Sequence, residues 1–239
     1  MKMGFGVQAI LRILPVLIVA ECLSGCVAHR IGSLPTILAD AGRGSGNFVR
    51  ARQTLANMFP SRYRATQRAI ISVGGKQFTC DGVLTAAPDK GRELAIVSNL
   101  GAVTGLRVRP DGECELLKIT PLFPAEWSRR FVAEDLRCLF VPPRNLEPAG
   151  RLADGRLVLR TKLDAERAEA WYVFAASGER WQELDLMQDN RCRYRAVIRR
   201  YGAFAGIPGE VPCEFEVDAG SHRLDLRITG LTVPTDTAP

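Results

Sequence analysis

The chain has 239 residues, a formal net charge of +6 and 46% hydrophobic residues. That length suits one domain with a sizeable core, and no repeat or change of composition marks a second domain. The sequence contains only two histidines, His29 and His222, which excludes a histidine-cluster metal site. Most of the positive charge is arginine, which is consistent with contact to anionic head groups and equally with the composition of the genome.

The first 26 residues have the parts of a secretory signal. Lys2 gives a basic start, an apolar stretch runs from Ile10 to Ala20, and Leu23-Ser24-Gly25-Cys26 ends the segment. The apolar stretch is shorter than the roughly 20 residues that span a bilayer. The final four residues resemble the lipobox of bacterial lipoproteins, in which the cysteine becomes the lipid-modified first residue. We expect residues 1–25 to be a lipoprotein signal peptide and Cys26 the lipid anchor; the alternative is a poor transmembrane anchor.

This interpretation of the N-terminus predicts the compartment. A lipoprotein cysteine carries a diacylglycerol and usually an N-acyl chain such as palmitate, and stable anchoring needs two or more such chains. In enteric bacteria an aspartate after the cysteine retains lipoproteins at the inner membrane, so Val27 favours the outer membrane by resemblance. We therefore expect a lipid-anchored protein on the periplasmic face of the outer membrane, where nucleic acid is not a partner.

A tether and a single domain are expected after the anchor. Residues 26–46 include Gly42-Arg43-Gly44-Ser45-Gly46, a flexible run without the G-x-G-x-x-G spacing of a phosphate loop. Residues 47–233 carry the periodic patterns of a folded domain, and residues 234–239 are typical of a disordered tail.

The expected domain contains an odd number of cysteines. In the periplasm at most two disulfides can form within the chain, and at least one thiol stays free. The sequence does not specify the pairing, and the absence of a C-x-x-C pair argues against a redox motif or a zinc knuckle. The cysteines concerned are Cys80, Cys114, Cys138, Cys192 and Cys213.

Hydrophobic alternation predicts an antiparallel meander. A helix from Asn47 to Phe59 comes first, and Thr66–Val73 and Lys76–Thr85 follow as strands joined by Gly74-Gly75, a hairpin signal. A helical insertion ends at Pro142-Pro143, after Pro124 opens it. Further strand signals lie at residues 92–99, 103–109, 113–120, 155–162, 168–176, 181–187, 191–201, 210–218 and 221–233.

Candidate catalytic groups are sparse. His222 begins a strand beside Arg223, and we expect it at a solvated edge position. Glu134 and Asp135 are neighbours on the expected helix and should point in different directions. There is no G-x-S-x-G elbow for an esterase. The sequence therefore predicts no catalytic residues, no bound metal and no cofactor, and we expect a protein that is not an enzyme.

Three segments together resemble the lipoprotein-localisation factors of the LolA/LolB type, and LolB most closely. The hairpin 93–108, with Asn99-Leu100-Gly101 at its tip, is similar to the family's hairpin, although the proline usual before the tip leucine is absent. The helix Glu134–Phe140, ending at Pro142-Pro143, resembles the helical segment that follows the family's first strands. The strands from Val211-Pro212 to Val233 resemble its last hairpin.

The resemblance implies a mainly β fold with some α-helix: an incomplete antiparallel barrel, or half-barrel, closed by helices around an apolar cavity that accepts acyl chains. Alternation along the strands then gives candidate cavity-lining residues, for which an ordinary filled core is the equal alternative. These are Phe78, Leu84, Leu94, Ile96, Leu116, Tyr172, Phe174, Ile198, Phe215, Leu224 and Leu226.

The resemblance also implies a role. Leu100 matches an exposed apolar residue at the family's hairpin tip that helps to deliver cargo to the membrane; packing back against the sheet is the alternative for it. The expected function is a carrier or acceptor, in effect a chaperone, for lipoproteins or related acylated molecules, with a periplasmic carrier protein as a partner. The alternative function is a structural lipoprotein that docks protein partners in an envelope assembly.

Overall fold

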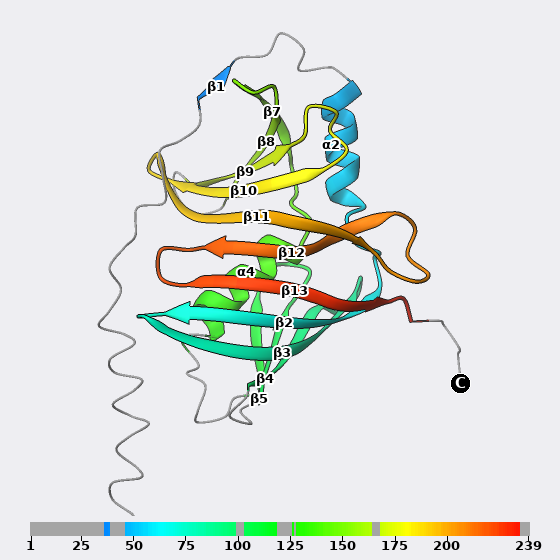
Figure 1. Cartoon of the computed structure of the whole chain (residues 1–239), viewed down its shortest axis with the longest axis vertical. Coiled ribbons are helices and arrows are strands. Elements are labelled where there is room, and N and C mark those ends of the chain that lie inside the picture. Colours follow the sequence, from blue (N-terminus) through cyan, green and yellow to red (C-terminus); the bar gives the residue numbers. More distant parts are fainter. Residues whose placement is uncertain are drawn as a thin grey trace, which may run out of the picture.

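The computed structural model describes residues 36–38, 46–98, 103–118, 126, 128–163 and 168–234. Within these residues the strands form one antiparallel sheet of 13 strands, in the order β1-β7-β8-β9-β10-β11-β12-β13-β2-β3-β4-β5-β6. The two outer strands of that order, β1 and β6, do not pair with each other, so the sheet is strongly curved but open (Figure 1). The half-barrel expected from the sequence is confirmed.

The strands follow the chain with short connections, so that most neighbours in the sheet are also neighbours in sequence. Their bounds are β1 Ile37–Leu38, β2 Tyr63–Val73, β3 Lys76–Ala87, β4 Gly91–Ser98, β5 Val103–Val108, β6 Cys114–Lys118, β7 Glu147–Leu152, β8 Leu157–Lys162, β9 Ala168–Phe174, β10 Trp181–Gln188, β11 Arg191–Ala203, β12 Glu210–Asp218 and β13 Arg223–Thr232.

A long non-local pairing joins an early strand to the last strand. The last strand, β13, pairs with β2 from Arg223 opposite Ser72 to Thr232 opposite Arg64. The hairpin β2–β3 has the predicted turn, because Val73 pairs with Lys76 across Gly74-Gly75. The strand pair β13–β2 therefore unites the early hairpins with the late ones in a single sheet.

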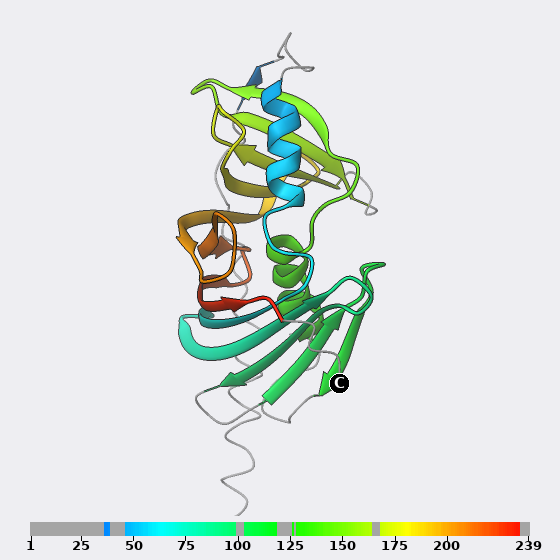
Figure 2. The same cartoon turned by 90° about the vertical axis from the view of Figure 1, so that its right-hand side faces the viewer.

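Two helical segments cover the inner, concave face of the sheet. Helix α2, Gly46–Ala56, buries Phe48, Ala51 and Leu55 against the half that contains β8 and β10. A single π-helical turn, η1 (Ser128–Val132), leads into α4 (Ala133–Phe140), which lies inside the half formed by β2–β5 (Figure 2). No helix among the described residues is long and apolar enough to cross a membrane.

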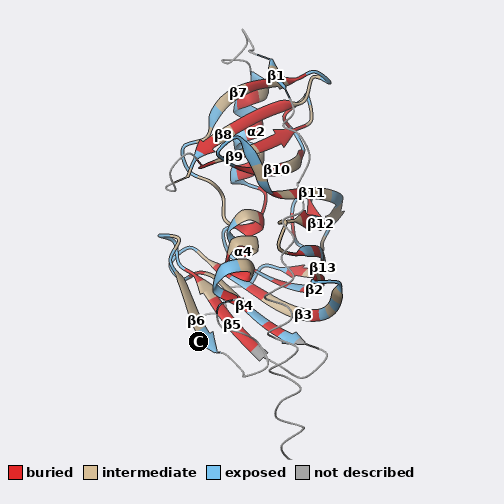
Figure 3. Ribbon diagram, turned by 90° about the vertical axis from the view of Figure 1, so that its left-hand side faces the viewer, coloured by how far each residue is buried: buried red, intermediate tan, exposed pale blue. Residues whose placement is uncertain are grey.

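The main core lies between these helices and the inner face of the sheet (Figure 3). Aromatic side chains connect the two halves: the ring of Phe140 on α4 lies 5.5 Å from that of Phe59 and 6.0 Å from that of Phe215, between centroids. A smaller apolar cluster of Leu152, Val158 and Val173 lies apart from it, with Ile37 of β1 packed against it. Ile37 and Leu38, inside the segment expected to be a tether, thus belong to the sheet.

Candidate functional site

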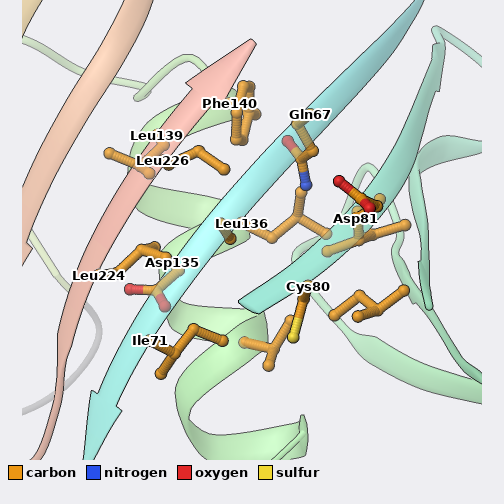
Figure 4. A pocket seen from close by; sticks show the side chains of 15 residues that line it. Gln67, Ile71, Cys80, Asp81, Asp135, Leu136, Leu139, Phe140, Leu224 and Leu226 are labelled. Atoms are coloured by element: carbon orange, nitrogen blue, oxygen red, sulfur yellow. The ribbon is translucent and has the colours of Figure 1, made fainter. Parts of the chain in front are cut away.

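A cavity lies between α4 and the inner face of β2, β3, β4 and β13 (Figure 4). Its volume is about 50 Å³. A single buried water needs roughly 10–15 Å³ on this measure, so the cavity holds only a few waters. Its wall is mainly apolar and includes Ile71, Leu94, Ile96, Leu136, Leu139, Phe140, Leu224 and Leu226.

Small residues on two neighbouring strands leave this space open. Ala69 on β2 pairs with Cys80 on β3, and Gln67 pairs with Gly82, and all four line the cavity. The larger inner residues Ile71 and Leu84 lie on either side along these strands. The gap lies beneath α4, where Leu136, Leu139 and Phe140 form its other wall.

Gln67 is the polar exception among the inner positions of β2. The inner series runs Tyr63, Ala65, Gln67, Ala69, Ile71, and each of its neighbours in the series is apolar or aromatic. Gln67 is only 8% exposed, and its amide oxygen Oε1 has no hydrogen-bond partner among the described residues. Such a group is costly to bury unless something else bonds to it.

Gly82 gives the Gln67 side chain its room. A Cβ atom at position 82 would lie 3.2 Å from both Cγ and Nε2 of Gln67. That distance is tighter than ordinary van der Waals contact, so any larger residue would press on the amide. The pairing of a buried glutamine with a glycine therefore fixes where the polar group stands in the cavity wall (Figure 4).

A second polar group reaches the cavity from α4. Asp135 lines it, and its Oδ2 atom lies 3.1 Å from Nε2 of His222, just before β13. The other ring nitrogen of His222, Nδ1, lies 3.1 Å from the hydroxyl of Ser221. The expectation of a solvated edge position for His222 is wrong: the residue is 4% exposed, because α4 covers it.

Charges around His222 set its titration. Burial lowers the pKa of the imidazole, but the hydrogen bond to Asp135 and the negative charges of Asp135, Glu134 and Asp218 outweigh burial, so the pKa is raised above its usual value. As expected, the neighbouring acids of α4 diverge: Glu134 pairs with Arg193 on β11 at 2.8 Å, while Asp135 meets His222. Two polar contacts therefore fasten the start of α4 to the sheet.

The buried phenol of Tyr194 lies near the same acids. Burial raises its pKa well above the usual value, and the nearby Asp135 carboxylate raises it further. The thiol of Cys138 on α4 also has a raised pKa, chiefly through burial. Both groups are therefore neutral at physiological pH. Among the described residues no group of three or more potential ligands could hold a metal ion.

The structure divides the sequence-predicted inner residues into three groups. Leu94, Ile96, Leu224 and Leu226 line the cavity. Leu84, Tyr172, Phe174 and Phe215 are buried in the main core, and Phe78, Leu116 and Ile198 are half-buried. Cys26 and Leu100 lie outside the described residues.

Sequence reasoning missed the polar groups Gln67 and Asp135 as parts of one site. For Gln67 a signal exists, since it interrupts an alternating apolar series. For Asp135 none exists, because its partner His222 is 87 residues away along the chain. All five cysteines of the domain are free thiols in the structure, so none of the pairings left open by the sequence is present.

Comparisons with known proteins agree with this architecture. No family model matches the sequence, and no curated protein matches it. Among solved structures, a DUF1329 family protein from Desulfovibrio piger is similar, with a TM-score of 0.54 and 10% identity, over 81% of this chain and 96% of that protein. A putative outer membrane lipoprotein-sorting protein domain from Vibrio parahaemolyticus is similar at a TM-score of 0.50 and 9% identity, over 80% of this chain and 93% of that domain. These likenesses show that the chain shares its fold with a domain of the lipoprotein-sorting type.

Proposed function

We propose that this protein is an outer-membrane lipoprotein that binds an acyl chain between α4 and the sheet, acting as a carrier or acceptor for lipoproteins or related lipids. The observation that carries the proposal is the apolar cavity beneath a short helix, on a fold shared with a lipoprotein-sorting domain. Binding by such a wall needs no catalytic group, because each buried CH₂ contributes about 0.8 kcal/mol.

The closed cavity is too small for an acyl chain, so binding requires α4 to move. The helix has eight residues and buries Leu136, Leu139 and Phe140 against the inner face. An acyl chain that replaced these side chains would cover the same apolar wall, so that its packing against the sheet offsets the packing that α4 gives up. The polar contacts of α4, including Arg137 to the carbonyl of Gly112 at 2.8 Å, would have to break and reform as the helix moves.

The anchor and the hairpin tip complete the proposal. A lipidated Cys26 would hold the domain on the periplasmic face of the outer membrane, where it could receive cargo from a periplasmic carrier protein. Leu100, in the segment of sequence between β4 and β5, would enter the bilayer surface when cargo is released. Both roles rest on the sequence resemblance.

The test uses the full chain with Cys26→Ala, which prevents lipidation, and a fluorescent fatty acid. We expect uptake of the fatty acid by this protein, and loss of most uptake when Ala69→Leu fills the cavity. Thr79→Leu is the matched control, because Thr79 is exposed on the outer face of β3, next to Cys80, the partner of Ala69. A folded protein that takes up no fatty acid at any concentration below its solubility limit would contradict the proposal.

The small volume of the closed cavity favours one other function. A domain whose interior stays filled by its own side chains would act as a structural lipoprotein that docks protein partners in an envelope assembly. Native mass spectrometry of the chain purified from a membrane-containing host separates the two functions. Co-purified lipid supports the carrier, whereas a stable protein partner without lipid supports the structural role.

A further inference from the structure

We propose that the acyl chain accepted beneath α4 carries a hydrogen-bond donor, a hydroxyl or an amide N–H, that bonds to the side-chain amide of Gln67. This inference rests on the proposed function and specifies its ligand. It is drawn from a polar atom that the apolar cavity leaves without a partner among the described residues.

Gln67 is placed as a recognition group and not as a surface residue. It is 8% exposed, it stands at an inner position of β2, and its Oε1 has no partner among the described residues. An ordinary core would carry an apolar residue here, as it does at Ala65 and Ala69. A buried amide oxygen without a partner destabilises a fold, so a residue of this kind is expected where a ligand completes its bonding.

The opposite strand keeps the amide in the cavity. Gly82 faces Gln67, and the missing Cβ leaves the room that the amide occupies. Figure 4 shows the Gln67 amide at the cavity wall, with Phe140 and Leu136 of α4 to one side and Asp81 of β3 to the other. The group therefore meets whatever replaces α4 on this part of the sheet.

The chemistry of the Gln67 amide narrows the ligand. Asp135, the second acceptor beside the cavity, is on α4 and moves away with the helix when an acyl chain enters. The Gln67 oxygen, which stays with the sheet, favours a chain that carries a donor over a plain methylene chain, which has none to offer. A hydroxyl satisfies the Gln67 amide in either orientation of that amide, because it both donates and accepts.

Competition against a bound fluorescent fatty acid tests the inference, with the full chain carrying Cys26→Ala. Three ligands of similar length are compared: tetradecanoate, 3-hydroxytetradecanoate and N-dodecanoylglycine. We expect the wild-type pocket to prefer the hydroxylated chain, the amide-bearing chain or both over tetradecanoate by about five- to tenfold, the effect of one hydrogen bond. The two donor ligands distinguish a hydroxyl from an amide as the recognised group.

A variant of Gln67 tests whether this residue causes the preference for donor-bearing ligands. Gln67→Leu has a similar volume, and we expect it to bind all three ligands equally while keeping or improving its affinity for tetradecanoate. Gln77→Leu is the control, because Gln77 is exposed on β3 and its substitution should leave the preference intact. Circular dichroism checks folding, and Gln67→Met replaces the leucine variant if that variant does not fold.

Each outcome decides between explanations. Equal affinity of the wild-type protein for all three ligands, or a preference that persists in the folded Gln67 variant, would overturn the inference and leave Gln67 as a group that binds only buried water. That result leaves the carrier proposal standing, since fatty acids still bind. Failure of every ligand to displace the probe, or of the probe to bind, overturns both.

Discussion

Nε2 of His222 lies 3.1 Å from Oδ2 of Asp135, so a residue next to the last strand is bonded to a helix 87 positions earlier in the chain. The contact ties the start of α4 to the turn that precedes β13, a strand inside the sheet order. Because the pKa of His222 is raised in the fold, the strength of this tie depends on pH.

We expect the contribution of the His222–Asp135 pair to fall as pH rises. A histidine whose folded pKa is raised stabilises the fold fully below its unfolded pKa of about 6.5, and this stabilisation is lost as pH rises through the higher folded value. Asp135→Asn should lower the free energy of unfolding by about 1–2 kcal/mol at pH 6 and by less at pH 9. Urea denaturation at both values measures the difference.

Asp225→Asn is the control for this prediction, because Asp225 is exposed on β13 and away from the pair. Its effect should be small and the same at both pH values. A difference between wild type and Asp135→Asn that does not change with pH would show that the charge on His222 plays no part.

Arg195 should be required for the stability of the fold, because it neutralises a fully buried carboxylate. The Asp185 side chain has no exposed surface, and Nε and Nη2 of Arg195 contact its two oxygens at 2.7 and 3.0 Å. Arg195→Met leaves that carboxylate without its cation and should cost about 3–5 kcal/mol in urea denaturation. Arg199→Met, at an exposed pair with Glu216, should cost less than about 1 kcal/mol. Similar losses in the two variants would contradict this account.

The packing of α2 should be sensitive to substitution of Gly178, which lies in the turn between β9 and β10. Its φ is +79°, and a Cβ there would lie 2.3 Å from the carbonyl oxygen of Asn47, at the start of α2. Gly206 has a φ of +77° but no atom within 4 Å of such a Cβ. Gly206→Ala should therefore cost about 1–2 kcal/mol for its backbone conformation alone.

Gly178→Ala adds a clash with α2 to the same backbone cost, so its loss should be roughly 3 kcal/mol or more. Thermal unfolding of the two variants checks the order. Equal melting temperatures would mean that α2 can shift without loss of stability. Its contact with the β9–β10 turn would then not be specific.

Leu100→Glu should impair delivery of cargo to membranes without unfolding the protein. The prediction rests on the family resemblance of the hairpin tip, and a carboxylate there would oppose entry into the bilayer. Transfer of a fluorescent acylated peptide to vesicles measures it. Val97→Glu is matched to it, because Val97 is on the same hairpin and 48% exposed, and its substitution should change transfer less. If a folded Leu100→Glu protein transferred cargo at the wild-type level, the proposed membrane-inserting role of Leu100 would be wrong.

Local patterns predicted the strands well where a turn and an alternating segment coincide. The bounds of β12, Glu210–Asp218, are those expected, and Gly74-Gly75 forms the expected turn. Strand β7 was missed because Pro148 interrupts its pattern, and its ladder shifts register between Pro148 and Gly150. Strand β1 has two residues and depends on pairing with β7, which no local signal announces.

The site was less predictable than the strands because it depends on where α4 crosses the sheet. Alternation places Leu224 and Phe215 on the same inner face, yet Leu224 lines the cavity while Phe215 packs against Phe140 and Trp181 in the core. Period-2 reasoning identifies the face of a strand but not the element that covers it. The burial of His222 has the same cause. Its position next to β13 predicts exposure, but α4, from a distant part of the chain, covers it.

With Cys26 lipidated, as proposed above, the pairing of β1 with β7 would limit how far the domain can move from the membrane. With Cys26 as the anchor, Ile37, the first residue of the sheet, follows only eleven positions later in the chain. A fully extended chain of that length spans about 40 Å. The β1 end of the domain would then stay within this radius of its anchor point, and a longer linker would widen the radius.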